Sequence, residues 1–92
     1  MRLDKYLKVS RIIKRRTVAN EACSGGRVTL NGKVAKPGAE VKPGDRITIR
    51  FGEHLGQYEV TAVMETVRKD QASEMYRILS EDSYTEAERN QG

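Results

Sequence analysis

Basic side chains crowd the start of the chain, where they could bind the phosphates of a nucleic acid. Within the 92 residues, positions 1–16 hold seven cations against a single acid, Asp4. Like charges at this density repel one another, and a bound polyanion relieves that repulsion. The candidate binding residues are therefore Arg2, Lys5, Lys8, Arg11, Lys14, Arg15 and Arg16, with Arg27 further along the chain as an eighth.

The rest of the chain does not share this charge. Residues 1–50 contain thirteen Lys and Arg against four Asp and Glu, whereas residues 51–92 contain four against nine. A run of cations is most often a solvated helix face, but such a face normally carries compensating acids. We therefore expect a nucleic-acid-binding surface that comes from the first half of the chain.

The types and positions of the cations indicate how phosphate would be held. Lys14, Arg15 and Arg16 directly precede a predicted helix, whose free N–H groups and positive dipole end favour phosphate. Arginine can also bind two phosphate oxygens at once. For about four to six neutralised phosphates, the logarithm of the affinity should fall against the logarithm of the salt concentration with a slope of about −3 to −5.

RNA is favoured over DNA as the ligand. The sequence has no long helix with Asn, Gln or Arg spaced to read bases in a major groove, and no sign of a dimer, so we expect a monomer. It also lacks a strand with an aromatic pair that would stack single-stranded bases. What remains is recognition of the backbone and shape of a folded RNA.

Other chemistries find little support in the sequence. Cys23 lies on a predicted apolar stripe and is interpreted as a buried hydrophobic residue, and His54 as an ordinary surface residue in a loop. We expect no metal, no cofactor and no enzyme activity, because one Cys and one His are too few for zinc and the first fifty residues hold no paired carboxylates. The lack of an apolar run of about 18 residues and of a signal peptide predicts no membrane association and a cytoplasmic location.

Two short helices should carry the cations. Apolar residues at helical spacing predict a first helix over 3–13, with Ser10 as a possible break where the pattern changes register. A second stripe predicts a helix over 18–24, with Thr17 as its N-cap and the glycine pair 25–26 at its C-terminal end. The cations then lie on the first helix and on the connection to the second.

A small sheet should support these helices. Asn31-Gly32 is a strong hairpin signal, and residues 42–45 have proline and glycine placed for a type II turn. Alternating apolar and polar residues predict a half-buried strand over 46–51 and another over 57–63.

The last part of the chain is predicted to contain one more helix and a polar tail. Residues 70–80 return to helical spacing, and residues 81–92 are acidic, polar and expected to be disordered. We therefore predict an α+β fold with two short N-terminal helices packed on a small, mostly antiparallel twisted sheet, plus a C-terminal helix. It should form a single RNA-binding domain over 1–80, with a core motif over 1–51 and a strand and helix extension over 52–80.

Five short motifs follow one another in order: Arg2–Leu7, Lys14–Thr17, Gly26–Val28, Asn31–Lys33 and Val41–Asp45. Together they closely resemble the S4 (alpha-L) RNA-binding domain, over about residues 1–51. The resemblance implies the alpha-L fold, in which two short helices pack on a small twisted sheet. S4 domains are often appended to enzymes, but a catalytic domain does not fit in the remaining residues, so the free-standing members are the relevant comparison.

Among these, the chain most resembles the RqcP family of bacterial ribosome-associated quality control, through its opening, its Ile13–Arg16 run and residues 74–79. That resemblance implies binding to a large ribosomal subunit that still carries peptidyl-tRNA, with contacts to ribosomal RNA and to the P-site tRNA. It also implies cooperation with RqcH in adding alanine tails. Arg2 and Arg16 match the family's RNA-contacting arginines.

Three alternatives stay open. The heat-shock protein of fifteen kilodaltons also resembles this chain and binds obstructed large subunits, but that family has a long basic C-terminal extension and a tryptophan in its first helix, where this chain has Tyr6. A protein-interaction adaptor could use the predicted 70–80 helix and the acidic second half to dock a partner. A free RNA chaperone would use the same basic surface without a ribosome.

Overall fold

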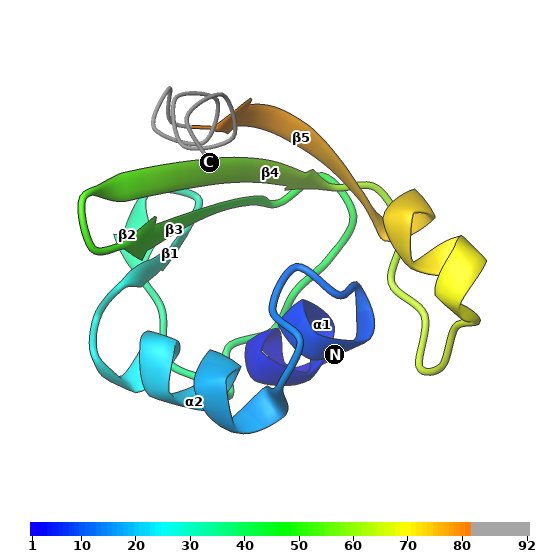
Figure 1. Cartoon of the computed structure of the whole chain (residues 1–92), viewed down its shortest axis with the longest axis horizontal. Coiled ribbons are helices and arrows are strands. Elements are labelled where there is room, and N and C mark those ends of the chain that lie inside the picture. Colours follow the sequence, from blue (N-terminus) through cyan, green and yellow to red (C-terminus); the bar gives the residue numbers. More distant parts are fainter. Residues whose placement is uncertain (82–92) are drawn as a thin grey trace, which may run out of the picture.

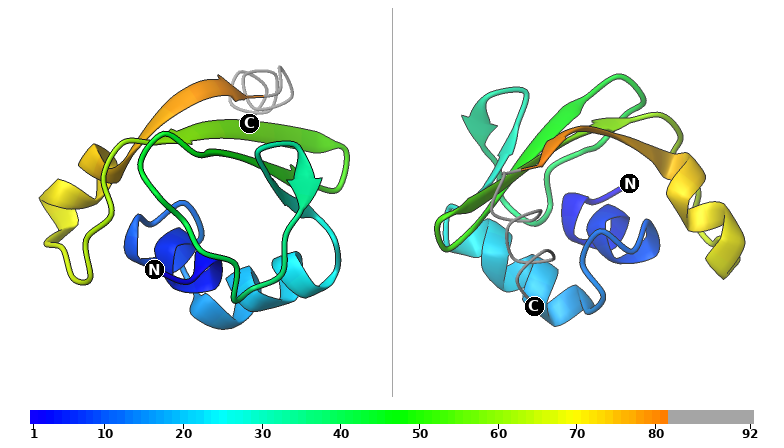
Figure 2. Two further views of the ribbon diagram at one scale, coloured as in Figure 1. Left: turned by 180° about the vertical axis from the view of Figure 1, so that it is seen from behind. Right: turned by 45° about the horizontal axis from the view of Figure 1, so that its top comes forward.

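A five-stranded antiparallel sheet with two helices on one face makes up residues 1–81, the part of the chain that the computed structural model describes (Figure 1). The strand order is β2-β1-β3-β4-β5. A 3-10 helix, η1, lies on the same side of the molecule as α1 (Figure 2). The predicted α+β class is confirmed. In chain order the elements are α1 (Leu3–Val9), α2 (Arg16–Ser24), β1 (Val28–Leu30), β2 (Lys33–Val34), β3 (Arg46–Phe51), β4 (His54–Val60), η1 (Lys69–Met75) and β5 (Tyr76–Glu81).

Helix α1 is shorter than its apolar pattern predicts. It ends at Val9 and not at residue 13, because the chain leaves the helix at Ser10, whose hydroxyl donates to the Leu7 carbonyl at 3.3 Å. Arg11 then adopts a left-handed backbone conformation, with φ of 66°. The break expected at Ser10 is confirmed. The apolar residues that predicted this helix form its buried face, through Leu3, Tyr6 and Leu7.

Helix α2 begins two residues earlier than predicted, at Arg16. Thr17 is therefore not the N-cap, because the extended backbone that an N-cap requires belongs to Arg15, which makes no side-chain capping bond. The glycine end is confirmed: Gly26 has φ of 77°, and the Arg27 N–H bonds back to a carbonyl of the last turn at 3.0 Å. This left-handed ending matches the Schellman motif, for which glycine is the preferred residue.

Local turn chemistry shapes the first part of the sheet. Asn31 and Gly32 have φ of 54° and 86°, the type I′ geometry that joins β1 to β2 in a tight hairpin. Gly44 has φ of 95°, and the Asp45 N–H bonds the Lys42 carbonyl at 3.1 Å, as a type II turn requires. Both predicted turns are confirmed, and β3 spans the predicted residues.

Strand β4 is displaced by three residues from the predicted range of 57–63. The turn after β3 is tight, with Gly52 at φ of 60°, so that His54 already lies opposite Phe51. Pairing with β3 therefore starts at His54, which belongs to a strand and not to a loop. It ends at Val60, after which the chain turns away from the sheet.

The prediction of a helix over 70–80 is wrong for the second half of that range. Residues 69–75 form the 3-10 helix η1, but residues 76–81 form β5 along the free edge of β4, with Tyr76 opposite Val60 and Ile78 opposite Tyr58. Helical spacing and strand pairing compete here, and the ladder of backbone hydrogen bonds with β4 decides the outcome. The predicted tail over 81–92 lies outside the described residues, apart from the end of β5.

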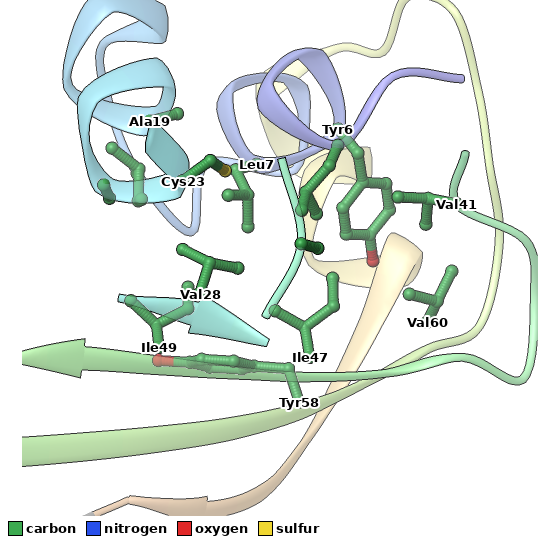
Figure 3. Close-up of a cluster of buried hydrophobic side chains, with 14 of the residues drawn as sticks. Tyr6, Leu7, Ala19, Cys23, Val28, Val41, Ile47, Ile49, Tyr58 and Val60 are labelled. Atoms are coloured by element: carbon green, nitrogen blue, oxygen red, sulfur yellow. The ribbon is translucent and has the colours of Figure 1, made fainter. Parts of the chain in front are cut away.

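The core lies between the two helices and the sheet (Figure 3). Tyr6 of α1 is fully buried, and its hydroxyl donates to the Met75 carbonyl at 2.6 Å. Burial, with a smaller contribution from Tyr76, raises the pKa of Tyr6 far above its usual value. This bond connects α1 to the end of η1, so the last part of the chain holds the first helix in place.

Candidate nucleic-acid interface

Five of the eight predicted cations line one groove, which we call the basic groove. It has a volume of about 530 Å³ and runs between α1, the loop that follows it and the segment between β4 and η1. The lining residues are Lys5, Lys8, Val9, Arg11, Lys14, Arg16, Glu65, Thr66 and Val67. Cations from three consecutive parts of the chain thus converge on one hollow.

Local structure explains how these side chains reach the groove. Lys5 and Lys8 are three residues apart on α1, and therefore share a face that lies away from the buried Leu3 and Leu7. Arg11 is exposed at the turn after α1, where its left-handed backbone replaces a further helical turn. A residue with a Cβ atom pays about 1 kcal/mol for that conformation, which glycine adopts freely.

Four residues of the groove are not among the predicted binding residues, and Glu65 is the charged one. Glu65, on the segment between β4 and η1, accepts a hydrogen bond from the Lys5 Nζ at 2.5 Å. This bond and the charge of Lys5 lower the pKa of Glu65. Sixty positions separate the two residues, so no local pattern could have indicated their contact.

A second hollow, which we call the Asp4 hollow, lies beside the basic groove. Its lining residues are Arg2, Asp4, Arg16, Thr17, Asn20 and Glu21. Arg2 is held there by the chain around residue 40, because the neighbouring Leu3 N–H bonds the Ala39 carbonyl at 2.8 Å and the Val41 N–H bonds the Met1 carbonyl at 3.0 Å. Arg16 lines both hollows and joins them into one continuous surface.

Asp4 is the buried centre of this second hollow, with 2% of its surface exposed. Its carboxylate accepts hydrogen bonds from Arg2 at 3.2 and 3.3 Å, from Asn20 at 3.2 Å and from Arg16 at 3.5 Å. Burial by itself raises the pKa of Asp4, but the bonds from Arg2 and Asn20 and the charge of Arg16 outweigh it and bring the pKa below its usual value. Asp4 is therefore ionised at neutral pH.

The two remaining predicted cations lie apart from these hollows. Arg15 is exposed directly before α2 and lines neither of them. Arg27 is exposed beyond the opposite end of α2, which is about 13 Å long for its nine residues. The surface that the structure brings together is thus centred on α1, the connecting loop and the first turn of α2.

The residues considered for other chemistry have structural positions. Cys23 is 2% exposed, and burial, with a smaller contribution from Asp4, raises the pKa of its thiol to about 11. Within residues 1–81, no three His, Cys, Asp or Glu side chains gather in a way that could hold a metal ion. No helix in that part of the chain has the length and apolar composition of a bilayer span.

Comparison with known proteins supports an RNA-binding assignment. Residues 1–47 match the S4 domain family. The chain is 56% identical over 88 residues to the "RQC P-site tRNA stabilizing factor" of Halalkalibacterium halodurans, covering 96% of this chain and 100% of that protein. It is 50% identical over 86 residues to the factor of the same name in Bacillus subtilis, covering 94% of this chain and 100% of that protein.

A solved structure shares the fold. The trimeric structure of heat shock protein 15 of Vibrio cholerae matches with a TM-score of 0.80 and 35% identity, over 98% of this chain and 91% of that one. Its sequence identity of 35% is lower than the 56% and 50% of the two curated relatives, which this chain matches over their full length. The chain therefore belongs to the S4-domain family and, within it, to the group of RQC P-site tRNA stabilizing factors.

Proposed function

We propose that this protein is a non-catalytic factor of ribosome-associated quality control that binds obstructed large ribosomal subunits through ribosomal RNA and P-site tRNA. The observation that carries the proposal is the continuous cationic surface of the basic groove and the Asp4 hollow. All of its cations lie within residues 1–47, which match the S4 domain. Relatives that match over their full length are named for stabilising P-site tRNA.

The arrangement of the two hollows suits contact with two RNA segments. Lys8, Arg11 and Lys14 are exposed around the basic groove, while Arg2 has its guanidinium in the Asp4 hollow. Arg16 is shared, and its side chain is 48% exposed, which leaves N–H groups available to a phosphate. We assign binding to Arg2, Lys5, Lys8, Arg11, Lys14, Arg15, Arg16 and Arg27, with the last two at the margin.

The step that this binding supports is the addition of alanine tails with RqcH. Tail synthesis needs a peptidyl-tRNA that stays in place between successive additions, and a small rigid cationic domain can hold it without chemistry of its own. The factor acts as a monomer in the cytoplasm, with residues 1–80 as one RNA-binding domain.

The proposal is tested by sedimenting the tagged protein from cells on a sucrose gradient and sequencing the bound RNA. We expect co-migration with free large subunits, together with large-subunit ribosomal RNA and tRNA. Protein that stays at the top of the gradient with neither RNA would contradict the proposal. Cells that lack the protein should lose alanine tails on stalled chains, and regain them with the wild-type gene.

The shared fold with heat shock protein 15 supports one second candidate, a recycling factor for obstructed subunits. That function predicts unchanged alanine tails in the deletion strain and an accumulation of large subunits that carry peptidyl-tRNA. The adaptor hypothesis loses the helix on which it depended, because residues 76–80 form a strand and Met75 is fully buried.

A further inference from the structure

Three acids line the basic surface, and two of them, Asp4 and Glu65, bond its cations in different surroundings. Asp4 is buried between α1 and α2 and is bonded to Arg2, Arg16 and Asn20. Glu65 has a side chain that is 72% exposed and bonds Lys5 across the basic groove. By charge alone, each acid should repel RNA and weaken its binding.

The contacts of Asp4 indicate the opposite effect. Arginine is long and flexible, so a free guanidinium loses conformational entropy when a phosphate fixes it. Asp4 fixes two guanidinium groups before any RNA arrives: it engages Arg2 through Nε and one Nη, and Arg16 through one Nη at 3.5 Å. Each guanidinium carries five N–H groups, so donors remain for phosphate.

We propose that Asp4 is a positioning residue that holds Arg2 and Arg16 in the geometry that binds RNA phosphate, and thereby strengthens binding despite its negative charge. The proposal rests on the RNA-binding function proposed above. Asn20 fixes the carboxylate from the α2 side, at 3.2 Å. Glu65 has the reverse role, because it competes with phosphate for Lys5 and weakens binding.

The test uses two substitutions that each remove one negative charge at almost constant size, Asp4→Asn and Glu65→Gln. Binding of labelled bacterial tRNA is measured by fluorescence anisotropy over a range of salt concentrations, for the full chain and both variants. We expect Asp4→Asn to bind roughly tenfold more weakly, as for the loss of a charge-assisted contact. Glu65→Gln should bind about two- to threefold more tightly, as for relief of an exposed pair.

Two further readouts separate positioning from a purely structural role, since Asp4 also lies in the first turn of α1. If Arg2 and Arg16 lose contact with phosphate, the log–log salt slope should become shallower by about one unit for each arginine. In an Arg16→Gln background, Asp4→Asn should weaken binding only about twofold more, because the effect through Arg16 is already lost and only the effect through Arg2 remains.

The outcomes distinguish this inference from the proposed function. If the wild-type chain does not bind tRNA at low salt, the proposed function fails, and the inference with it. If the wild type binds and folded Asp4→Asn binds as tightly or more tightly, the inference alone is overturned. Should Asp4→Asn not fold, judged by circular dichroism, Asp4→Glu takes its place: it keeps the charge, displaces the carboxylate, and is expected to weaken binding about threefold or more. Undiminished binding by that folded variant would overturn the inference.

Discussion

The helix face and the outer sheet face both carry arginines, yet only one of them forms a cationic surface. On the sheet, Arg46 and Arg50 point away from the helices, alternating with the buried Ile47 and Ile49 of β3. The neighbouring Arg77 of β5 bonds Glu59 of β4 directly. Arg46 lies opposite the same Glu59, so two of these three cations have an acid beside them.

On the helix face, cations from α1, its following loop and the start of α2 line two adjoining hollows. The buried acid there, Asp4, bonds two arginines, while the exposed Glu65 pairs with only one lysine. The number of cations therefore does not define a polyanion site. Convergence in a hollow, and the way each acid is placed among the cations, define it.

Reversing a charge on the helix face should have the largest effect on binding. Arg16→Glu should weaken binding to large subunits by about 2–3 kcal/mol, or roughly 30- to 150-fold, because it removes the arginine shared by both hollows. The fold should survive, since Asp4 keeps its bonds to Arg2 and Asn20. Pelleting with purified large subunits measures the effect.

The matched control is Arg50→Glu, which makes the same charge change at an exposed position on the outer sheet face. We expect its binding to differ from wild type by less than about threefold, as for a distant screened charge. Equal losses for Arg16→Glu and Arg50→Glu would show that net charge alone, and not the helix face, drives binding.

The pH dependence of stability tests the role of the buried Asp4 carboxylate. Because the pKa of Asp4 is lower in the folded chain than in the unfolded one, its stabilising contribution is complete above the unfolded pKa of about 4 and is lost as the pH falls through the folded pKa. Asp4→Asn should lower the free energy of unfolding by about 1–3 kcal/mol at neutral pH.

The same variant should also lose less stability than wild type below about pH 4, because the titrating group is gone. Urea unfolding monitored by circular dichroism between neutral and acidic pH measures both effects. A wild type and a variant with parallel profiles would mean that the contacts of Asp4 contribute nothing to the pH dependence.

Substitution of Arg11 should have the smallest effects, with opposite signs for stability and for tRNA binding. Arg11→Gly should raise the free energy of unfolding by about 0.5–1 kcal/mol, because glycine adopts the left-handed conformation without strain. It should also weaken tRNA binding by about threefold, through loss of one phosphate contact. Thermal unfolding and anisotropy titration test the two halves, and a destabilised variant with full affinity would contradict both.

Features that depend on nearby residues could be predicted from the sequence. The Asn31-Gly32 hairpin, the Gly44 turn and the glycine ending of α2 follow from backbone conformations that few residues favour, so short motifs predict them. The buried stripe of α1 follows from apolar spacing. The cations of the basic groove all come from the first sixteen residues, where their density is visible in the sequence.

Features that depend on contacts between distant parts of the chain could not be predicted from the sequence. Residues 76–80 have helical spacing, but the free edge of β4 makes them a strand. The contact of Glu65 with Lys5 and the burial of Asp4 among three donors depend on how α1, α2 and the segment after β4 pack together. Asp4 was visible in the sequence as a lone acid among cations, but its burial was not.

The most direct test of the helix face is to place a photo-crosslinking amino acid at Thr17, in the Asp4 hollow, or at Gln57, on the outer sheet face. Both are exposed uncharged positions, so neither substitution removes a cation. After irradiation of cells, the RNA crosslinked to each protein is sequenced. We predict tRNA or large-subunit ribosomal RNA from position 17 and neither from position 57. RNA captured from position 57 and none from position 17 would contradict RNA binding by the helix face.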